Sequence, residues 1–308
     1  MIELDRVTRR FGPMVAVDAV SLTIPTGAFC VLIGSSGAGK STTLRMINRL
    51  IAPSEGTIRV DGQDAASVRP EELRRRMGYV IQSIGLFPHW TVERNIGAVP
   101  SLLGWPEARI RQRAGELLTM LKLDPEAVRR KYPHQLSIGQ QQRVGIARAL
   151  AADPDLLLMD EPFGALDPIT RDALQAEIAR IHGASRKTVV FVTHDMDEAL
   201  RLATQIAIMD RGRLVQSGAP LELLTAPAND FVRDFVGREE LGMRLLSVEK
   251  VAQRFRPGET VPGEPIAVEA SLRQALSLMM ARGTDRIAVV DAKGRSLGAV
   301  HLADLVRR

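Results

Sequence analysis

The chain has 308 residues, of which 45% are hydrophobic and 25% are charged, and its net charge is +5. This is the composition of a globular protein with a substantial core, not of a disordered chain. Aromatic residues make up only 4%, and basic residues occur in short scattered clusters, so no nucleic-acid-binding stripe is predicted; no apolar run approaches the about 20 residues of a membrane helix.

The N-terminal stretch MIELDRVTRR is amphipathic, and we expect that it is not a signal peptide. Residues 21–34, SLTIPTGAFCVLIG, alternate and end in an apolar strand that contains Cys30. This single cysteine fits a reducing cytosol, and a small core residue is favoured over a nucleophile. Residues 41–50 have helical spacing, with Leu44, Ile47 and Leu50 apolar.

Between this strand and this helix, residues 34–41, GSSGAGKS, match the phosphate-loop pattern G-x-x-x-x-G-K-[ST]. Glycines let backbone N–H groups wrap a phosphate chain, Lys40 adds charge at the β and γ phosphates, and Ser41 can bind Mg²⁺. The predicted ATP-binding residues here are Gly34, Ser35, Ser36, Gly37, Ala38, Gly39, Lys40, Ser41 and Thr42. The pattern alone predicts nucleotide binding but not the kind of NTPase.

The middle of the chain is predicted to be largely helical, from about residue 105 to 150. Before it, the run MGYVIQ is apolar up to Gln82. Gln82 is therefore predicted to lie at the end of a strand, like the candidate residues described below. Within it, LSIGQQQR at residues 136–143 poses a question, because it reads either as a polar helix start or as half of a ligand site.

Two further apolar runs end in chemically active side chains. LLLMDEP places Asp160 and Glu161 at the carboxyl edge of the sheet, where the phosphate loop also lies. Asp160 is predicted to hold Mg²⁺, and Glu161, pointing elsewhere by strand alternation, could take a proton from an attacking water. TVVFVTHD ends in His194, a candidate contact for the γ phosphate.

Short apolar strands that alternate with helices predict an α/β domain with a mainly parallel sheet. We expect this domain to span residues 1–240. A linker is predicted over 241–265, where RPGETVPGEP is rich in Pro and Gly. A small α/β unit over 266–308 follows, with a helix at 271–283, a hairpin at 286–300 and a last helix at 301–308.

With these motifs in this order, residues 1–237 resemble the ATP-binding subunits of ABC transporters. The resemblance implies a P-loop NTPase fold with a mainly parallel core sheet, an N-terminal antiparallel β subdomain and an inserted helical subdomain. It also implies that Phe11 stacks on adenine and that Gln82 touches Mg²⁺ and the attacking water. Glu161 resembles the catalytic base and His194 the γ-phosphate switch.

The same resemblance implies a homodimer that sandwiches two ATP molecules head to tail. Each ATP would lie under Ser137, Gly139 and Gln140 of the other subunit, with Asp167 of ALDP crossing the interface. At position 138 the family usually has Gly. If the backbone there is right-handed helical, Ile138 is tolerated; if it needs positive φ, Ile138 is strained. We favour the helical alternative, because the first helical turn should begin there.

YVIQSIGLFPHWTVERNI resembles the Gln-loop region of ATPases that drive uptake of quaternary-amine osmoprotectants such as glycine betaine, choline and carnitine. Nothing in the chain selects a quaternary ammonium, so this substrate class rests on resemblance alone. The resemblance implies ATP with Mg²⁺, two separate permease subunits in the membrane, a periplasmic or lipid-anchored solute-binding protein, no nucleic-acid partner, and a peripheral position on the cytoplasmic face of the inner membrane. An importer of another small solute, such as an amino acid, and a soluble non-transport ABC ATPase stay open.

The tail resembles a single CBS motif, a unit that normally occurs in pairs. Asp304 matches the position of an Asp that binds adenosine ribose in many such motifs. His301 stands where Ser or Thr is usual. A structural dimerisation tail is therefore favoured over a nucleotide site.

Overall fold

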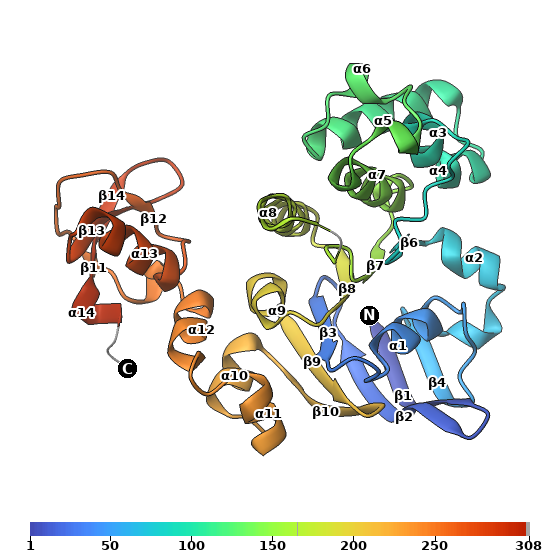
Figure 1. The fold of residues 1–308 in the computed structure, drawn as a ribbon, viewed down its shortest axis with the longest axis horizontal. Helices are drawn as coiled ribbons and strands as arrows, with labels where there is room; N and C mark the ends of the chain where they lie inside the picture. Colours follow the sequence, from blue (N-terminus) through green and yellow to red (C-terminus); the bar gives the residue numbers. More distant parts are fainter. Residues whose placement is uncertain (165, 306–308) are drawn as a thin grey trace. The chain divides into compact units, whose positions relative to one another are not determined.

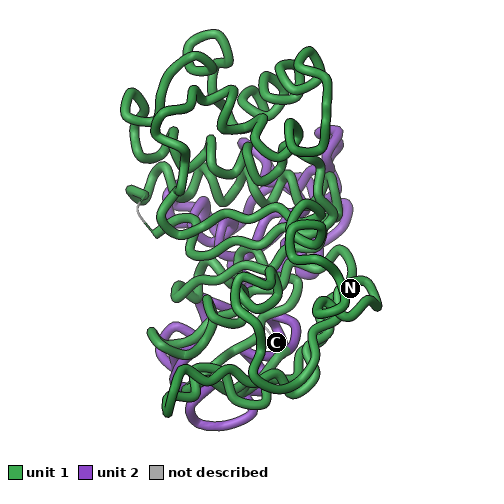
Figure 2. Tube along the Cα trace, turned by 90° about the vertical axis from the view of Figure 1, so that its right-hand side faces the viewer, with its two compact units in different colours: residues 1–217 green, residues 218–308 purple. Residues whose placement is uncertain are grey.

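The computed structural model describes residues 1–164 and 166–305. The chain divides into two compact units, residues 1–217 and 218–308, which Figure 2 colours separately. The first unit ends earlier than the domain boundary expected at residue 240, which stays a prediction.

An antiparallel sheet of order β2-β1-β4-β5 opens the first unit (Figure 1). Its strands are β1 (Ile2–Phe11), β2 (Met14–Ile24), β4 (Glu55–Val60) and β5 (Gln63–Asp64). Along β1 the apolar residues Ile2, Leu4 and Val7 are buried, so one face of this sheet contributes to the core. The predicted N-terminal antiparallel subdomain is confirmed.

The central sheet of the first unit has the order β10-β9-β3-β8-β7-β6. Its strands are β3 (Phe29–Gly34), β6 (Met77–Val80), β7 (Leu156–Asp160), β8 (Thr188–Thr193), β9 (Gln205–Asp210) and β10 (Arg213–Gly218). The pairs β3–β8, β3–β9, β6–β7 and β7–β8 are parallel. Every residue of β3, β7 and β8 is buried, as in a parallel sheet covered on both faces. The carboxyl ends of these strands therefore meet at one edge.

Helices surround this sheet and form a separate group above it (Figure 1). Around the sheet run α1 (Lys40–Ile47), α2 (Pro70–Arg75), α8 (Pro168–Ser185) and α9 (Met196–Leu202). The helical group, drawn in green tones, contains α3 (Val92–Ile96), α4 (Ala98–Leu102), α5 (Glu107–Met120), α6 (Pro125–Val128) and α7 (Ile138–Leu150). It is the inserted helical subdomain that the family resemblance implied.

The helix predicted over 41–50 ends earlier, at Ile47. Arg49 has a left-handed backbone with φ 48°, and its guanidinium donates to the carbonyl oxygen of Ala65 at 2.9 Å. The left-handed residue ends the helical conformation before residue 50. Leu50 is consequently 49% exposed, and its prediction as part of the apolar helix face is wrong.

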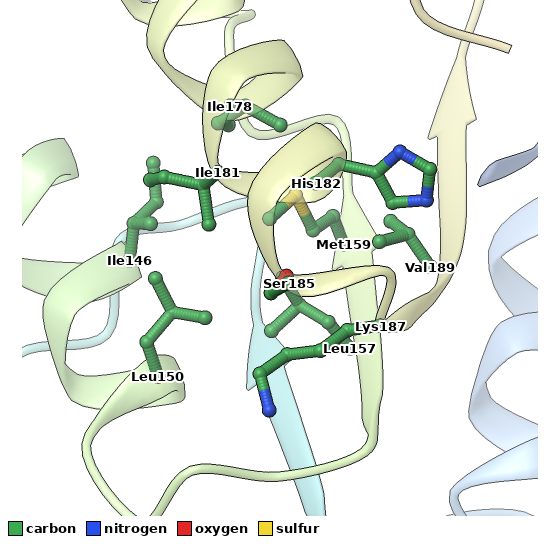
Figure 3. A pocket seen from close by; sticks show the side chains of 10 residues that line it. All are labelled: Ile146, Leu150, Leu157, Met159, Ile178, Ile181, His182, Ser185, Lys187 and Val189. Carbon is green, nitrogen blue, oxygen red and sulfur yellow. The ribbon is translucent and has the colours of Figure 1, made fainter. Parts of the chain in front are cut away.

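A small apolar pocket lies between helices α7 and α8 and strands β7 and β8. In Figure 3, Ile146 and Leu150 from α7 face Ile178 and Ile181 from α8. None of the predicted ATP-site residues lines it. We interpret it as a packing gap, because its polar lining residues His182 and Lys187 already contact the backbone carbonyl oxygens of Gly27 and Pro154.

The second unit has a hydrophobic core of its own, which includes Val251, Leu272, Met279 and Val300. Its helices are α10 (Pro220–Thr225), α11 (Asp230–Phe235), α12 (Leu241–Val248), α13 (Leu272–Arg282) and α14 (Leu302–Leu305). Its sheet has the order β11-β14-β13-β12, with β11 (Arg256–Pro257), β14 (Ser296–His301), β13 (Arg286–Val290) and β12 (Ile266–Ala267).

The expected linker over 241–265 begins instead with helix α12, which packs against α10 and α13. The physical reason is that Leu246 packs on the core of the second unit. The predicted hairpin is confirmed as the antiparallel pair β13–β14. The last predicted helix is α14, and residues 306–308 lie outside the described residues.

The described parts of the chain contain no helix with the length and apolar character that crossing a membrane requires.

Candidate functional site

The phosphate loop joins the end of strand β3 to the start of helix α1. Lys40 is buried, and its Nζ donates to the carbonyl oxygens of Gly34 and Ser35 at 2.8 and 2.9 Å. Burial lowers the pKa of Lys40, while the carboxylates of Glu161 and Asp160 oppose that shift. The ammonium group is thus folded back over the loop, where a polyphosphate would meet it.

Two glycines of the loop have backbone conformations that a side chain would strain. Gly37 and Gly39 have φ values of 80° and 95°. A Cβ on Gly39 would also lie 2.5 Å from the carbonyl oxygen of Ala16, so only glycine fits there. Ser35 and Ser36 are exposed, Ala38 is buried, and Ser41 and Thr42 are half-buried at the start of α1. The loop therefore presents N–H groups and hydroxyls at one surface.

Asp160, the last residue of β7, faces the phosphate loop. Ser41 Oγ donates to its Oδ1 at 2.7 Å. Asp160 is only 1% exposed, and its Oδ2 is buried without a hydrogen-bond partner among the described residues. The guanidinium of Arg45 lies 3.7 Å from this oxygen. Burial raises the pKa of Asp160, and the hydrogen bond from Ser41 and the charge of Arg45 oppose that shift.

This arrangement fits a divalent cation. A buried carboxylate oxygen without a partner is costly unless a ligand satisfies it, and carboxylate and hydroxyl oxygens are ligands that Mg²⁺ prefers. No cluster of three or more His, Cys, Asp or Glu side chains in the described residues could hold a metal by itself. Ser41 Oγ and Asp160 Oδ2 are the oxygens there whose chemistry fits a divalent cation.

Glu161 lies one residue beyond β7, and two side chains converge on its carboxylate. Gln82 Nε2 donates to Glu161 Oε2 at 3.1 Å, and His194 Nδ1 lies 3.7 Å from the same oxygen. Glu161 has a left-handed backbone with φ 44°, an uncommon conformation for a residue other than glycine. The strand ends before Glu161, so this turn, and not strand alternation, directs its side chain.

The three residues that sequence analysis took as catalytic candidates, Gln82, Glu161 and His194, thus lie together although they are far apart in the chain. His194 is 67% exposed at its side chain, whereas Glu161 is 22% exposed. A water or phosphate could approach His194 from solvent while Glu161 stays partly shielded.

The segment LSIGQQQR begins helix α7, which lies in the helical group (Figure 1). Ser137 is the N-cap: its Oγ accepts from Gln140 N at 3.2 Å, and Gln140 Oε1 accepts from Ser137 N at 3.0 Å. This capping box leaves the Ser137 hydroxyl hydrogen available as a donor. A Cβ on Gly139 would meet Thr170 Cγ2 at 2.9 Å, so a small residue is needed there.

Ile138 is the first residue of α7 and does not have positive φ. The backbone there is right-handed, so the prediction of a helical and unstrained Ile138 is confirmed. Its side chain is 54% exposed and points away from the core.

Asp167 and Phe11 lie on the surface. Asp167 is the N-cap of α8 and accepts from Thr170 N at 3.0 Å, and hydrogen bonds from Thr170 lower its pKa. Phe11 ends strand β1, is 40% exposed, and carries the Arg9 guanidinium 4.5 Å from its ring centroid. Both are available to a ligand or a second subunit, but neither contacts the Glu161 cluster.

Arg45 is a site residue that sequence analysis missed. It lies four residues after Ser41 and so shares its face of α1, close to Asp160. The spacing of Ser41 and Arg45 was the available signal.

The chain is similar to proteins and domains of known families. The family model described as ABC transporter matches residues 17–164, and that described as CBS domain matches residues 264–308. The chain is 56% identical over 306 residues to the glycine betaine uptake system ATP-binding protein YehX of Escherichia coli (strain K12), with 99% of each chain covered. It is 49% identical to the glycine betaine/carnitine/choline transport ATP-binding protein OpuCA of Bacillus subtilis (strain 168), with 97% of this chain and 78% of that one covered.

Among solved structures, the dimeric MJ0796 ABC transporter cassette matches with a TM-score of 0.65 and 36% identity, covering 71% of this chain and 98% of that one. A dimer of the same cassette in a post-hydrolysis state bound to ADP and Pi matches with a TM-score of 0.65, 35% identity and the same coverage.

Proposed function

Because the chain belongs to the ATP-binding subunits of ABC transporters, we propose that it hydrolyses ATP to power uptake of a quaternary-amine osmoprotectant such as glycine betaine, choline or carnitine. The observation that carries the enzymatic part is the convergence of Gln82 and His194 on Glu161 Oε2 at 3.1 and 3.7 Å. The substrate class is supported by the relatives, which are named for uptake or transport of these solutes.

In this proposal the phosphate loop binds ATP and Glu161 is the general base. Lys40 contacts the β and γ phosphates, and loop N–H groups bind the rest of the phosphate chain. Glu161 Oε2 accepts a proton from the attacking water, which Gln82 orients, while His194 contacts the γ phosphate. Ser41, Asp160 and Gln82 would hold Mg²⁺, which would neutralise charge that develops on the phosphates. Phe11 stacks on the adenine ring.

The second half of each ATP site comes from another copy of the chain. Ser137, Gly139 and Gln140 offer a capped helix start with an available hydroxyl donor, and this supports a contact with the γ phosphate of the partner's ATP. Asp167, exposed at the start of α8, lies at the interface. Two copies are therefore needed for full turnover, and a monomer hydrolyses ATP poorly.

The remaining components of the importer are separate subunits. The relatives are named as ATP-binding proteins of uptake and transport systems, which supports two membrane permease subunits beside this chain and a periplasmic or lipid-anchored solute-binding protein. The ATPase dimer then sits at the cytoplasmic face of the inner membrane, and nucleic acid is not a partner.

The test is uptake of labelled glycine betaine in cells without other betaine uptake, with the chain, its permease pair and its binding protein expressed together. Uptake is expected with the parent chain and absent with Glu161→Gln. Glu116→Gln is the matched control, because Glu116 pairs with Gln112 on the surface of α5. Uptake of an amino acid in place of betaine would overturn the substrate class, and ATPase activity without any uptake would favour a soluble ABC ATPase.

A further inference from the structure

A buried hydroxyl closes the turn that carries His194. Thr193, the last residue of β8, is 3% exposed. Its Oγ1 accepts from Asp195 N at 3.0 Å and donates to Glu198 Oε2 at 2.6 Å. Asp195 in turn caps α9, accepting from Glu198 N at 3.2 Å. The residues on either side of His194, Thr193 and Asp195, are therefore joined by a hydrogen bond to the Thr193 hydroxyl.

The connection continues from α9 to α8. Gln175 Nε2, on α8, donates to Glu198 Oε1 at 3.1 Å, and Arg201 Nη1 donates to Gln175 Oε1 at 3.0 Å and to Asp172 Oδ1 at 2.9 Å. Gln175 and Glu198 are 4% and 6% exposed. In such a buried hydrogen-bond network each donor needs an acceptor, because a buried polar group without a partner loses its hydrogen bonds to water and forms none in the protein. The charges of Glu198 and Arg201 thus fix the direction of the hydrogen bonds between them.

We propose that Glu198 is a positioning residue for ATP hydrolysis. Through Thr193 it fixes the turn that carries His194, and through Gln175 it ties that turn to α8, the helix that Asp167 begins. One buried carboxylate thus connects the residue that contacts the γ phosphate with the helix whose N-cap, Asp167, is proposed to lie at the dimer interface. The inference rests on the proposed role of His194, and it adds Thr193, Gln175 and Glu198 as residues that act through other side chains.

The first test separates positioning from stability by comparing two threonines on one strand. Thr193→Val removes the hydroxyl at the end of β8, and kcat for ATP is expected to fall on the order of tenfold with KM within about twofold, because the phosphate loop is unchanged. Thr193→Ser keeps the hydroxyl and should stay near the parent kcat. Thr188→Val removes the hydroxyl that accepts from Gly27 N at the start of the same strand and should lower Tm but not kcat.

The second test reverses the polarity of the chain. In Glu198→Gln, the introduced amide oxygen can still accept from Thr193, but the introduced NH₂ group then faces the NH₂ group of Gln175. If the Gln175 amide rotates to present its oxygen to position 198, its NH₂ group faces the Arg201 guanidinium instead. One pair is then mismatched in either orientation. Adding Gln175→Glu restores every pair, because the carboxylate introduced at position 175 accepts from both neighbours. We expect Glu198→Gln to lower kcat several-fold and the double variant to recover most of it.

His194→Ala is assayed in the same series. A loss of kcat with His194→Ala but not with Thr193→Val or Glu198→Gln would overturn the positioning role and leave the proposed function intact. A parent-like kcat for His194→Ala would remove the γ-phosphate contact and the inference with it. Failure of the double variant to recover, at a Tm equal to that of the parent, would also overturn the inference.

Discussion

Two aspartates, one in each compact unit, match motif positions expected to contact a nucleotide, and their hydrogen bonding differs. Asp160 in the first unit has one oxygen paired with Ser41 and the other buried without a hydrogen bond from any described residue. Asp304 in the second unit has both oxygens paired with Arg256, at 2.8 and 2.9 Å. His301 beside it lies 2.8 Å from Glu259. At Asp160 one buried oxygen has no hydrogen-bond partner among the described residues, whereas at Asp304 each oxygen accepts from Arg256.

This difference indicates that a residue's match to a motif is weaker evidence for a ligand site than a buried polar atom that lacks a hydrogen-bond partner. A buried polar group without a partner costs free energy in the empty protein, and it persists where binding recovers that cost. Asp304 matches the expected ribose position by sequence, but Arg256 already occupies the carboxylate that a ribose would use. The ATP site and the tail are thus expected to respond very differently to mutation.

The largest expected effect of a mutation is a loss of ATP turnover at the site in the first unit. Glu161→Gln should lower ATP turnover by about 100-fold or more, since general-base catalysis contributes about 10²–10⁴-fold. Binding of ATP should persist, because Lys40 and the loop are unchanged, and an ATP-bound dimer should accumulate in size-exclusion chromatography. Steady-state phosphate release measures the first result. Turnover equal to that of the parent would remove Glu161 as the base.

A smaller loss is expected from Asp160→Asn, which tests the unsatisfied oxygen directly. The amide oxygen can still accept from Ser41, so the fold should be retained, but the charge that would hold Mg²⁺ is lost. We expect turnover at fixed Mg²⁺ to fall by about tenfold or more and its Mg²⁺ midpoint to rise in a Mg²⁺ titration. Asp153→Asn is the control: Asp153 pairs with Lys187 and precedes β7 at the opposite end. An unchanged midpoint would mean that Asp160 does not face the cation.

The sites around Asp160 and Asp304 also differ in how much of each could be predicted from the sequence. Buried strands with reactive side chains at their ends located Gly34, Asp160 and His194 at one edge, because parallel strands align their carboxyl ends. The pairing of Gln82 and His194 with Glu161 depends on the left-handed backbone at Glu161, which no pattern indicates. The Arg256–Asp304 pair joins residues 48 positions apart, and helix α12 depends on tertiary packing. Both are long-range outcomes that local propensity does not determine.

Little change is expected from Ile138→Gly, although the family usually has Gly there. The backbone at 138 is already helical, so no strain exists for Gly to relieve, and Gly costs slightly more than Ile in a helix. ATP turnover should stay within about threefold of the parent, with a small decrease in Tm. A gain of an order of magnitude would show that the Ile138 side chain obstructs the partner's ATP.

The smallest expected effect is on the tail, where adenosine should not bind. Phe11→Ala in the intact chain removes the ring proposed to stack on adenine at the first site, and equilibrium dialysis with labelled adenosine then reports on binding at the tail. We expect no saturable binding below about 1 mM, a free energy weaker than about −4 kcal/mol, because Arg256 and Glu259 occupy the groups that a ribose would need. Micromolar binding that is lost in Asp304→Asn would mean that adenosine displaces Arg256 from Asp304. The Arg256–Asp304 ion pair would then not prevent binding of a ligand.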